Sequence, residues 1–350
     1  MQMIPLTERQ GRILDILRGS PGMSSSLIQK AVSSVSLTTV KREVSILSVR
    51  GLIASSGKGR GAGYVLTKLG ELFTPVDAHS FCAQEPDARR GFERFDGALL
   101  PAIPQTVFTV DERKRLDEAT IAYNTRSKDL SETLAKKELE RFIIELSWKS
   151  SRIEGNTYTL LDTERLVRDG IEAPGHAPEE ATMILNHKKA FEFVHQNRAL
   201  FAGQPSRAAI EEIHRLLVEN LNVGRGVRRG AVGIVGTRYR PLDNQFQIHE
   251  AMDTLRAVIG ASADAYTAAL IALLGISYIQ PFEDGNKRTS RLLANAVLFA
   301  RGCAPLSYRS ADEVAYREAM LVFYETHSFV PFKDIFIEQY LFAAEQYGIQ

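Results

Sequence analysis

The most constraining feature of this chain is a long apolar segment that a proline interrupts. Residues 263–279 are nearly all apolar and predict a helix that is buried on every side. Pro281 lacks a backbone N–H and disfavours helix in the residue before it, so this helix must end near Gln280. A second helix can start at Asn286, because apolar residues then recur on one face as far as Gly302. The sequence therefore predicts two packed helices joined by a tight polar loop.

The second helix carries positive charge at the end where a helix favours negative charge. Lys287, Arg288 and Arg291 lie in its first turns, beside backbone amides that have no partner within the helix. Gly285 lets a ligand approach the backbone, and two arginines three residues apart can hold phosphates. Asp284 could hold a magnesium ion that bridges those phosphates. We expect a polyphosphate site here, the alternative being an ordinary surface helix with a basic start.

This stretch resembles the motif of Fic-domain proteins, His-Pro-Phe-x-[Asp/Glu]-Gly-Asn-x-Arg-x-x-Arg. The residues that match are Pro281, Phe282, Asp284, Gly285, Asn286, Arg288 and Arg291. Family members mostly transfer AMP from ATP to a Ser, Thr or Tyr hydroxyl of a target protein. The resemblance implies ATP and Mg²⁺ as cofactors and a protein as partner. It assigns the metal to Asp284, an anion hole to Gly285 and Asn286, and the nucleotide phosphates to Arg288 and Arg291.

The first position of the motif departs from the family pattern. The family's histidine takes the proton from the incoming hydroxyl, and Gln280 stands in its place. A glutamine amide does not titrate near neutral pH, so it cannot act as a general base. Three explanations remain open: a laboratory substitution, a natural member that binds nucleotide without transferring it, or a member with different chemistry.

A second motif resembles the family's inhibitory segment, [Ser/Thr]-x-x-x-Glu-[Gly/Asn]. A long helix is predicted over about 133–156, and Ser150, Glu154 and Gly155 match the motif near its end. The resemblance implies that Glu154 pairs with Arg291 and blocks the seat of the γ-phosphate. It also places the chain in the class whose inhibitory helix precedes the Fic core. Without the family, Glu154 is a solvated carboxylate beside a helix C-terminus.

Residues 226–248 change from a helical to an extended pattern and predict a small β-hairpin. The segment resembles the family's flap, which docks the target by adding it as a strand. Its tip would comprise Gly236, Thr237, Arg238 and Tyr239. The alternative is a plain surface hairpin that joins two helices.

The N-terminal residues 1–75 are basic, with ten Lys/Arg against four Asp/Glu, although the whole chain has a net charge of only +1. The order helix, helix, helix, hairpin resembles a winged helix-turn-helix that binds double-stranded DNA. Six residues would contact DNA: Thr38, Thr39, Lys41 and Arg42 on the third helix, and Lys58 and Arg60 on the wing. The alternative is a winged helix used for protein contacts.

The expected fold is mainly α: a winged helix over 1–75, a connector over 76–110, and a Fic-type helical bundle with a small β-hairpin flap over 111–350. Two cysteines are too few for a disulfide framework, which favours a cytoplasmic protein. No apolar run is long enough for a signal peptide or membrane span. Fic cores often form homodimers, but no face for this is evident. The leading function is an autoinhibited and impaired adenylyltransferase; the alternative is a DNA-binding transcriptional regulator with a degenerate nucleotide-sensing core.

Overall fold

The computed structural model describes residues 5–33, 35–57 and 62–349, and helices dominate them. The N-terminal part contains α1 (Glu8–Gly19), α2 (Ser25–Val32), α3 (Leu37–Val49), β1 (Ile53–Ser56), β2 (Gly63–Leu66), α4 (Lys68–Phe73) and α5 (Ala78–Cys82). A 3₁₀ turn, η2 (Leu100–Ala102), precedes the long helices α6 (Val110–Lys128) and α7 (Glu132–Ile153). The remaining elements are α8 (Leu160–Asp169), α9 (Pro178–Gln196), η3 (Arg198–Phe201), α10 (Arg207–Leu217), α11 (Gln245–Ala261), α12 (Ala265–Ile279), α13 (Asn286–Ala300), α14 (Glu313–Thr326) and α15 (Val330–Gln346).

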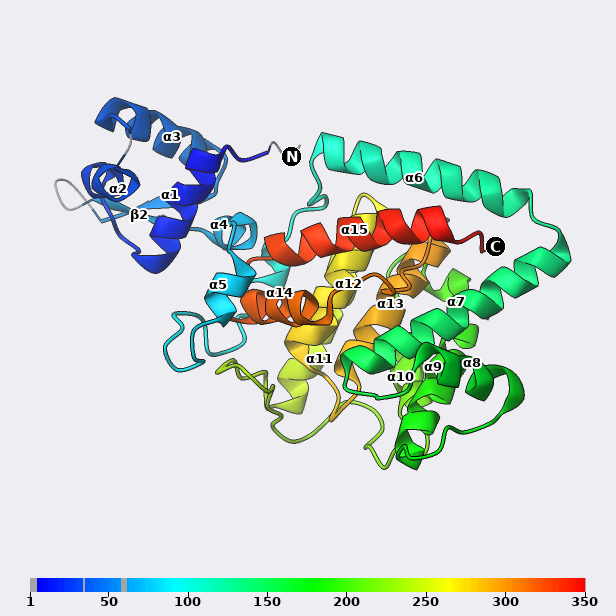
Figure 1. Cartoon of the computed structure of the whole chain (residues 1–350). Helices are drawn as coiled ribbons and strands as arrows, with labels where there is room; N and C mark the ends of the chain where they lie inside the picture. The colour runs from blue at the N-terminus through cyan, green and yellow to red at the C-terminus, as the bar shows by residue number, and fades with distance from the viewer. Residues whose placement is uncertain (1–4, 34, 58–61, 350) are drawn as a thin grey trace.

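Helices α12 and α13 form the centre of the bundle, as the apolar pattern predicts (Figure 1). Every residue of α12 after Ala265 is buried, and α13 is buried except at Lys287 and Ala300. A Cβ on Gly275 would lie 2.3 Å from Leu255 Cδ1, so this glycine lets α11 approach α12 closely. The two central helices are therefore fixed by packing on all sides, which makes the loop between them a rigid platform.

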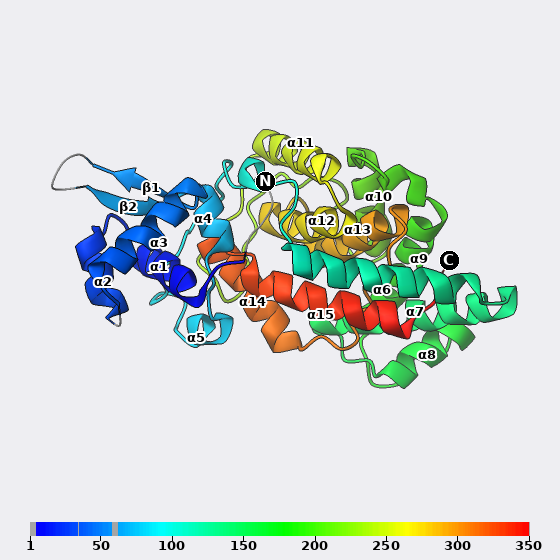
Figure 2. The same ribbon diagram turned by 90° about the horizontal axis from the view of Figure 1, so that it is seen from above.

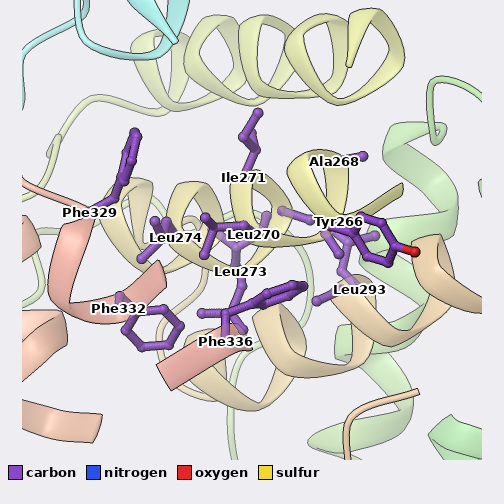
Figure 3. Close-up of a cluster of buried hydrophobic side chains, with 14 of the residues drawn as sticks. Tyr266, Ala268, Leu270, Ile271, Leu273, Leu274, Leu293, Phe329, Phe332 and Phe336 are labelled. Carbon is purple, nitrogen blue, oxygen red and sulfur yellow. The ribbon is translucent and has the colours of Figure 1, made fainter. Parts of the chain in front are cut away.

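The other helices cover this pair from several sides. In Figures 1 and 2, α6 and α15 run beside each other along one side of the bundle, and α7 to α10 enclose the far end. Figure 3 shows Leu273 of α12 facing Phe336 of α15, while Ile271 points to the opposite side, toward α11. The aromatic residues of α15 thus complete the core around α12.

The N-terminal unit, α1 to α4 with β1 and β2, lies at one end of the bundle (Figure 2). Strands β1 and β2 pair antiparallel, with Ile53 opposite Leu66. Two buried contacts join the unit to the bundle: the Ser328 hydroxyl donates to the Thr74 carbonyl at 2.6 Å, and Phe73 packs edge-on against Phe329. The unit is therefore attached through specific buried contacts as well as through the chain itself.

The mainly α class is confirmed, but the flap differs from the expected hairpin. Residues 226–248 contain no paired strands, and the only ladder contact is a parallel bridge between Arg240 and Arg94 of the connector. The two arms are joined by a side chain and not by paired strands. The Arg228 guanidinium donates to the carbonyl of Gly230 on one arm and to that of Leu242 on the other.

No helix within the described residues is both long and apolar enough to cross a bilayer.

Candidate active site

The polar loop between α12 and α13 begins at a residue with strained backbone geometry. Gln280 caps α12 in the left-handed region, with φ 50° and ψ 60°, which is unusual for a residue other than glycine. Its side-chain amide donates to the Ser277 carbonyl at 2.7 Å, and its own carbonyl accepts from Arg228 Nε at 2.6 Å. Gln280 is 7% exposed and lines the cavity described below, at the place where the motif requires a proton acceptor.

Two side chains hold the rest of the loop in shape. The Asn286 side chain both donates to the Phe282 carbonyl at 2.8 Å and accepts from the Phe282 N–H at 2.9 Å. His214 of α10 stacks on the Phe282 ring with centroids 3.8 Å apart, and its Nε2 lies 3.1 Å from the Asp284 carbonyl. Burial lowers the pKa of His214 to about 4, so its imidazole is neutral and donates this hydrogen bond from Nε2. Sequence reasoning missed this support of the loop by His214.

The N-terminus of α13 is left open toward a ligand. Gly285 is its N-cap, with φ 76°, and no side chain caps the first amides. Arg288, which is 3% exposed, reaches back to Asp284, with 3.0 Å between Nη2 and Oδ2. Uncapped amides, the positive end of a helix dipole and a buried guanidinium together form an anion-binding arrangement.

Arg291 lies behind this helix start with no exposed surface, and α7 supplies its partners. Its Nε donates to the Ser150 hydroxyl at 2.7 Å, and its Nη2 donates to the Ser150 carbonyl at 2.9 Å. Nη2 also lies 2.8 Å from Glu154 Oε1, while Lys287 is 3.9 Å from the other carboxylate oxygen. Gly155 follows with φ 98° and ends α7, which leaves Glu154 facing α13.

The charge of Glu154 is stabilised by its neighbours. Burial alone would raise the pKa of its carboxyl, but the Arg291 guanidinium and then the Lys287 ammonium hold that pKa below its usual value. Glu154 is therefore ionised at neutral pH and forms an ion pair with the buried Arg291 guanidinium.

Several buried polar atoms at this place lack hydrogen-bond partners. They are Arg288 Nη1, Arg291 Nη1, Glu154 Oε1 and the hydroxyls of Ser147, Ser151 and Thr289. Of their residues, Arg288 and Glu154 line the cavity described below, and a buried guanidinium N–H without a partner there fits a site that an anionic ligand completes. A phosphate-bearing group is suited to it, because each phosphate oxygen accepts several hydrogen bonds.

A cavity of about 270 Å³ opens over the loop. Its lining combines the predicted residues Glu154, Gln280, Asp284, Gly285, Asn286, Lys287 and Arg288 with Met183, Glu283 and residues 232–235. A neighbouring, more apolar cavity of about 300 Å³ shares Glu154, Ile234, Val235 and Lys287, and is completed by residues that include Tyr316, Met320 and Tyr324. The two cavities together offer a polar and an apolar compartment side by side.

The flap contributes to this site through residues other than those expected. Residues 232–235 line the cavities, and Val235 is 97% exposed at the turn. The expected tip lies against other parts of the chain: Gly236 and Arg238 contact the connector, and the Tyr239 hydroxyl donates to the Tyr278 carbonyl at 2.8 Å. Thr237 accepts from the Tyr239 N–H and so shapes the turn.

Arg228 is a further residue that the sequence reasoning missed. It is 2% exposed, its N–H donates to the Pro281 carbonyl at 3.0 Å, and its side chain joins Gln280 to both arms of the flap. The sequence shows two consecutive arginines, Arg228 and Arg229, near the start of the flap segment. Arginine is most often exposed, so this pair gave no reason to expect that Arg228 is buried.

Three carboxylates line this cavity: Glu154 pairs with Arg291, Glu283 accepts from the Gly224 N–H, and Asp284 is the candidate for a cation. Asp284 is 68% exposed at its side chain, and no group of three or more His, Cys, Asp or Glu within the described chain could hold a metal by itself. A single carboxylate fits Mg²⁺ that takes its other ligands from phosphates and water.

Residues expected to contact DNA lie far from this cavity, on the N-terminal unit. Thr38, Lys41 and Arg42 are exposed on α3, and Thr39 is half-buried with its hydroxyl 3.0 Å from that of Ser36. Lys58 and Arg60 lie outside the described residues.

The fold and the loop define a helical bundle built around an anion-binding turn. Residues 204–298, which contain that turn, match the model of the Fic/DOC family. This part of the chain is therefore a Fic domain.

Protein adenylyltransferases of this family are similar in sequence. The chain is 27% identical over 160 residues to protein adenylyltransferase fic-1 of Caenorhabditis elegans, covering 44% of this chain and 31% of that protein. It is 29% identical over 174 residues to protein adenylyltransferase Fic of Nematostella vectensis, and the match covers 49% of this chain and 41% of that protein. The chain thus spans less than half the length of these curated relatives.

Solved structures share the fold. Residues 134–508 of C. elegans Fic-1 superpose with a TM-score of 0.58 at 21% identity, covering 68% of this chain and 71% of that one. A Fic domain containing signaling protein from Bacteroides thetaiotaomicron superposes with a TM-score of 0.57 at 20% identity, and the match covers 66% of this chain and 94% of that one. This likeness extends beyond the matched family region into the surrounding helices.

We predict that Glu154→Gln destabilises the fold in a pH-dependent way. Loss of the carboxylate leaves Arg291 buried with less compensation, and we expect a loss of roughly 2 kcal/mol near pH 7, discounted for the partial exposure of Glu154. Folding lowers the pKa of Glu154, so the ionised carboxylate contributes fully to the free energy of unfolding above the unfolded pKa of 4.5. This contribution is lost as the pH falls through the pKa of the folded state. The difference in unfolding free energy between wild type and variant should shrink on acidification, as measured with urea.

The matched control is Glu132→Gln on the same helix, because Glu132 pairs with Lys136 in solvent and its side chain is 85% exposed. We expect no more than a few tenths of a kcal/mol for the control. An equal effect of the two substitutions would contradict the importance of the Glu154 pair.

Proposed function

We propose that this chain is a Fic-type protein adenylyltransferase scaffold that binds ATP with Mg²⁺ and directs AMP to a protein hydroxyl. The observation that carries the proposal is the cavity over the start of α13, where uncapped amides, Lys287 and Arg288 face one space and Arg291 lies directly behind it. The curated relatives are named protein adenylyltransferases, which supports the same class of reaction.

Each compartment has a part in this proposal. The amides of the α13 start and the two arginines hold the phosphates, and Asp284 would hold a magnesium ion, which would neutralise phosphate charge. The more apolar cavity beside Tyr316 and Met320 takes the nucleoside. Val235, exposed at the turn of the flap, lies where an extended target segment can be placed over the loop.

Glu154 holds the scaffold in an inhibited state in this proposal. Its carboxylate pairs with Arg291, and a carboxylate and a phosphate compete for the same guanidinium because both take paired hydrogen bonds. The terminal phosphate of ATP cannot reach Arg291 in its productive position until Glu154 moves away.

Gln280 limits transfer without removing the nucleotide site. In the transfer, the target hydroxyl oxygen bonds to the α-phosphorus, pyrophosphate leaves, and the hydroxyl proton must be accepted. The Gln280 amide already donates to Ser277 and has no basic site for that proton. Loss of a general base typically lowers the rate by roughly 10²–10⁴-fold, so the native chain is expected to bind ATP and to transfer AMP weakly or not at all.

We predict that Glu154→Gly increases the affinity for Mg·ATP at least roughly tenfold, since one charged hydrogen-bonding partner of Arg291 becomes available to phosphate. Isothermal titration calorimetry measures this directly. Arg288→Ala in the same background should abolish the gain, whereas Arg168→Ala, an exposed ion-paired arginine of α8, should preserve it. No heat of binding in the Glu154→Gly chain would refute the nucleotide site.

We further predict that Gln280→His raises AMP transfer from labelled ATP by roughly 10²–10⁴-fold, most clearly when combined with Glu154→Gly. The protein itself and a cell extract serve as acceptors, and Gln280→Asn controls for any effect of changing the side chain without adding a base. If the native chain and the histidine variant transfer AMP at the same rate, Gln280 is not the limiting feature.

A second function, binding of double-stranded DNA by the N-terminal unit, is proposed from one structural observation. Helix α3 exposes Thr38, Lys41 and Arg42 on the unit that also carries the β1–β2 hairpin, the arrangement of a winged helix. In this regulatory reading, the nucleotide site senses a ligand and α3 contacts a duplex.

We predict that a labelled mixed-sequence duplex binds with an affinity that falls steeply with salt, and that Lys41→Ala with Arg42→Ala lowers the log–log salt slope by about 2. Fluorescence anisotropy gives the slope, and Lys136→Ala, an exposed lysine of α7, is the control. Absence of binding at low salt would exclude the DNA function.

A further inference from the structure

The outer part of the flap is held by the connector that follows the N-terminal unit. The side chain of Arg89 in the connector donates to the carbonyl of Gly236 at the turn of the flap. Arg89 is 5% exposed, and its Nη2 lies 3.0 Å from Glu325 Oε1 at the end of α14. A buried arginine that contacts both a flap carbonyl and a carboxylate of the bundle can act as a clamp, because one guanidinium joins the two segments.

The same connector contacts the descending arm of the flap. The Arg240 N–H donates to the Glu93 carbonyl at 2.8 Å, and the Phe95 N–H donates to the Arg240 carbonyl at 3.3 Å. Arg238 pairs with Glu93 and also donates to the Asp87 carbonyl. Connector residues 87–95 thus contact this arm through hydrogen bonds and a single bridge at Arg94, and none of them lines the two cavities.

The connector is in turn fixed to the N-terminal unit. Asp96 pairs with Lys68 of α4 at 2.6 Å, and Phe92 stacks on the His327 ring with centroids 4.0 Å apart. His327 lies 2.8 Å from Glu71 of α4. The Phe92 N–H also donates to the Glu325 carbonyl, so the connector is held from both the unit and the bundle.

The flap is therefore held at two places of different origin. Arg228 holds the base of both arms against the loop at Gln280, and this clamp belongs to the Fic domain itself. Arg89 holds the turn from outside that domain, beside the exposed Val235 that lines the cavity. A clamp at the turn controls the position of the target-facing residues more directly than a clamp at the base.

We propose that Arg89 is a positioning residue for target docking. It orients the flap through Gly236, and it makes the order of the flap depend on how the N-terminal unit packs against the bundle. This inference rests on the proposed function, since it concerns how that function places its acceptor. Arg89 lines neither cavity, so it would act through the flap, and we expect its loss to affect acceptor placement with little change in nucleotide binding.

Hydrogen exchange at the Tyr239 and Arg240 amides tests the clamp without any activity. Arg89→Met should speed exchange at these amides by roughly tenfold, because loss of one charged hydrogen bond shifts a local opening equilibrium by that order. Arg90→Ala, its exposed neighbour, is the matched control and should leave exchange as in wild type.

A second variant separates positioning from folding. Arg89→Met leaves Glu325 buried without its cation, so Arg89→Met with Glu325→Gln removes both charges and preserves the fold. We expect the double variant to keep the thermal midpoint of wild type and still show fast exchange in the flap. Unchanged exchange in a folded double variant would overturn the proposal.

Kinetics then distinguish this inference from the proposed function. For the kinetic test, Arg89→Met with Glu325→Gln is introduced into a chain that also carries Gln280→His and Glu154→Gly. We expect this chain to transfer AMP to itself roughly tenfold more slowly than the chain with only Gln280→His and Glu154→Gly, with an unchanged KM for ATP. A raised KM for ATP would overturn the acceptor-side role. If the activated chain neither binds ATP nor transfers AMP, the proposed function fails, while the exchange result still decides whether Arg89 orders the flap.

Discussion

The structure depends on one buried cation, Arg291, which remains charged and has no contact with solvent. A guanidinium in such a place requires acceptors, and here Ser150 and Glu154 of α7 provide them. This requirement draws α7 against α13 and determines which end of α7 faces the cavity. In the function proposed above, the same carboxylate that satisfies Arg291 would compete with a phosphate for this guanidinium.

Around this pair, the site separates into two halves with different supports. The phosphate-facing half is built on α12 and α13, whose burial on all sides fixes the loop and its open amides. The acceptor-facing half is an irregular flap that has no strand ladder and relies on Arg228 and Arg89. Gln280 lies where the two halves meet, because it caps α12 and its carbonyl accepts from Arg228 of the flap. The flap itself is held from two parts of the chain, by Arg228 and by the connector residue Arg89.

Much of the phosphate-facing half could be predicted, because it depends on residues that lie close together in the sequence. Pro281 ends one helix, the apolar period restarts at Asn286, and the cations of the next turn have an evident electrostatic reason. The flap could not be predicted in the same way. Its extended pattern suggested a hairpin, yet only the arm that contains Arg240 forms a bridge, with a connector far away in sequence, and the Tyr239 hydroxyl donates to the Tyr278 carbonyl. Strand patterns show a tendency to extend but not the partner.

The sequence by itself determined the helical class, the central apolar helix, the loop chemistry around Asp284 and Arg288, and the resemblance of Glu154 to an inhibitory glutamate. Only the tertiary structure decided that Arg228 and Arg89 are buried clamps. Neither arginine differs in sequence from an exposed one, because burial and hydrogen-bond partners depend on segments that are distant along the chain. Local periodicity is encoded in neighbouring residues, whereas the pairing of buried charges exists only after the chain has folded.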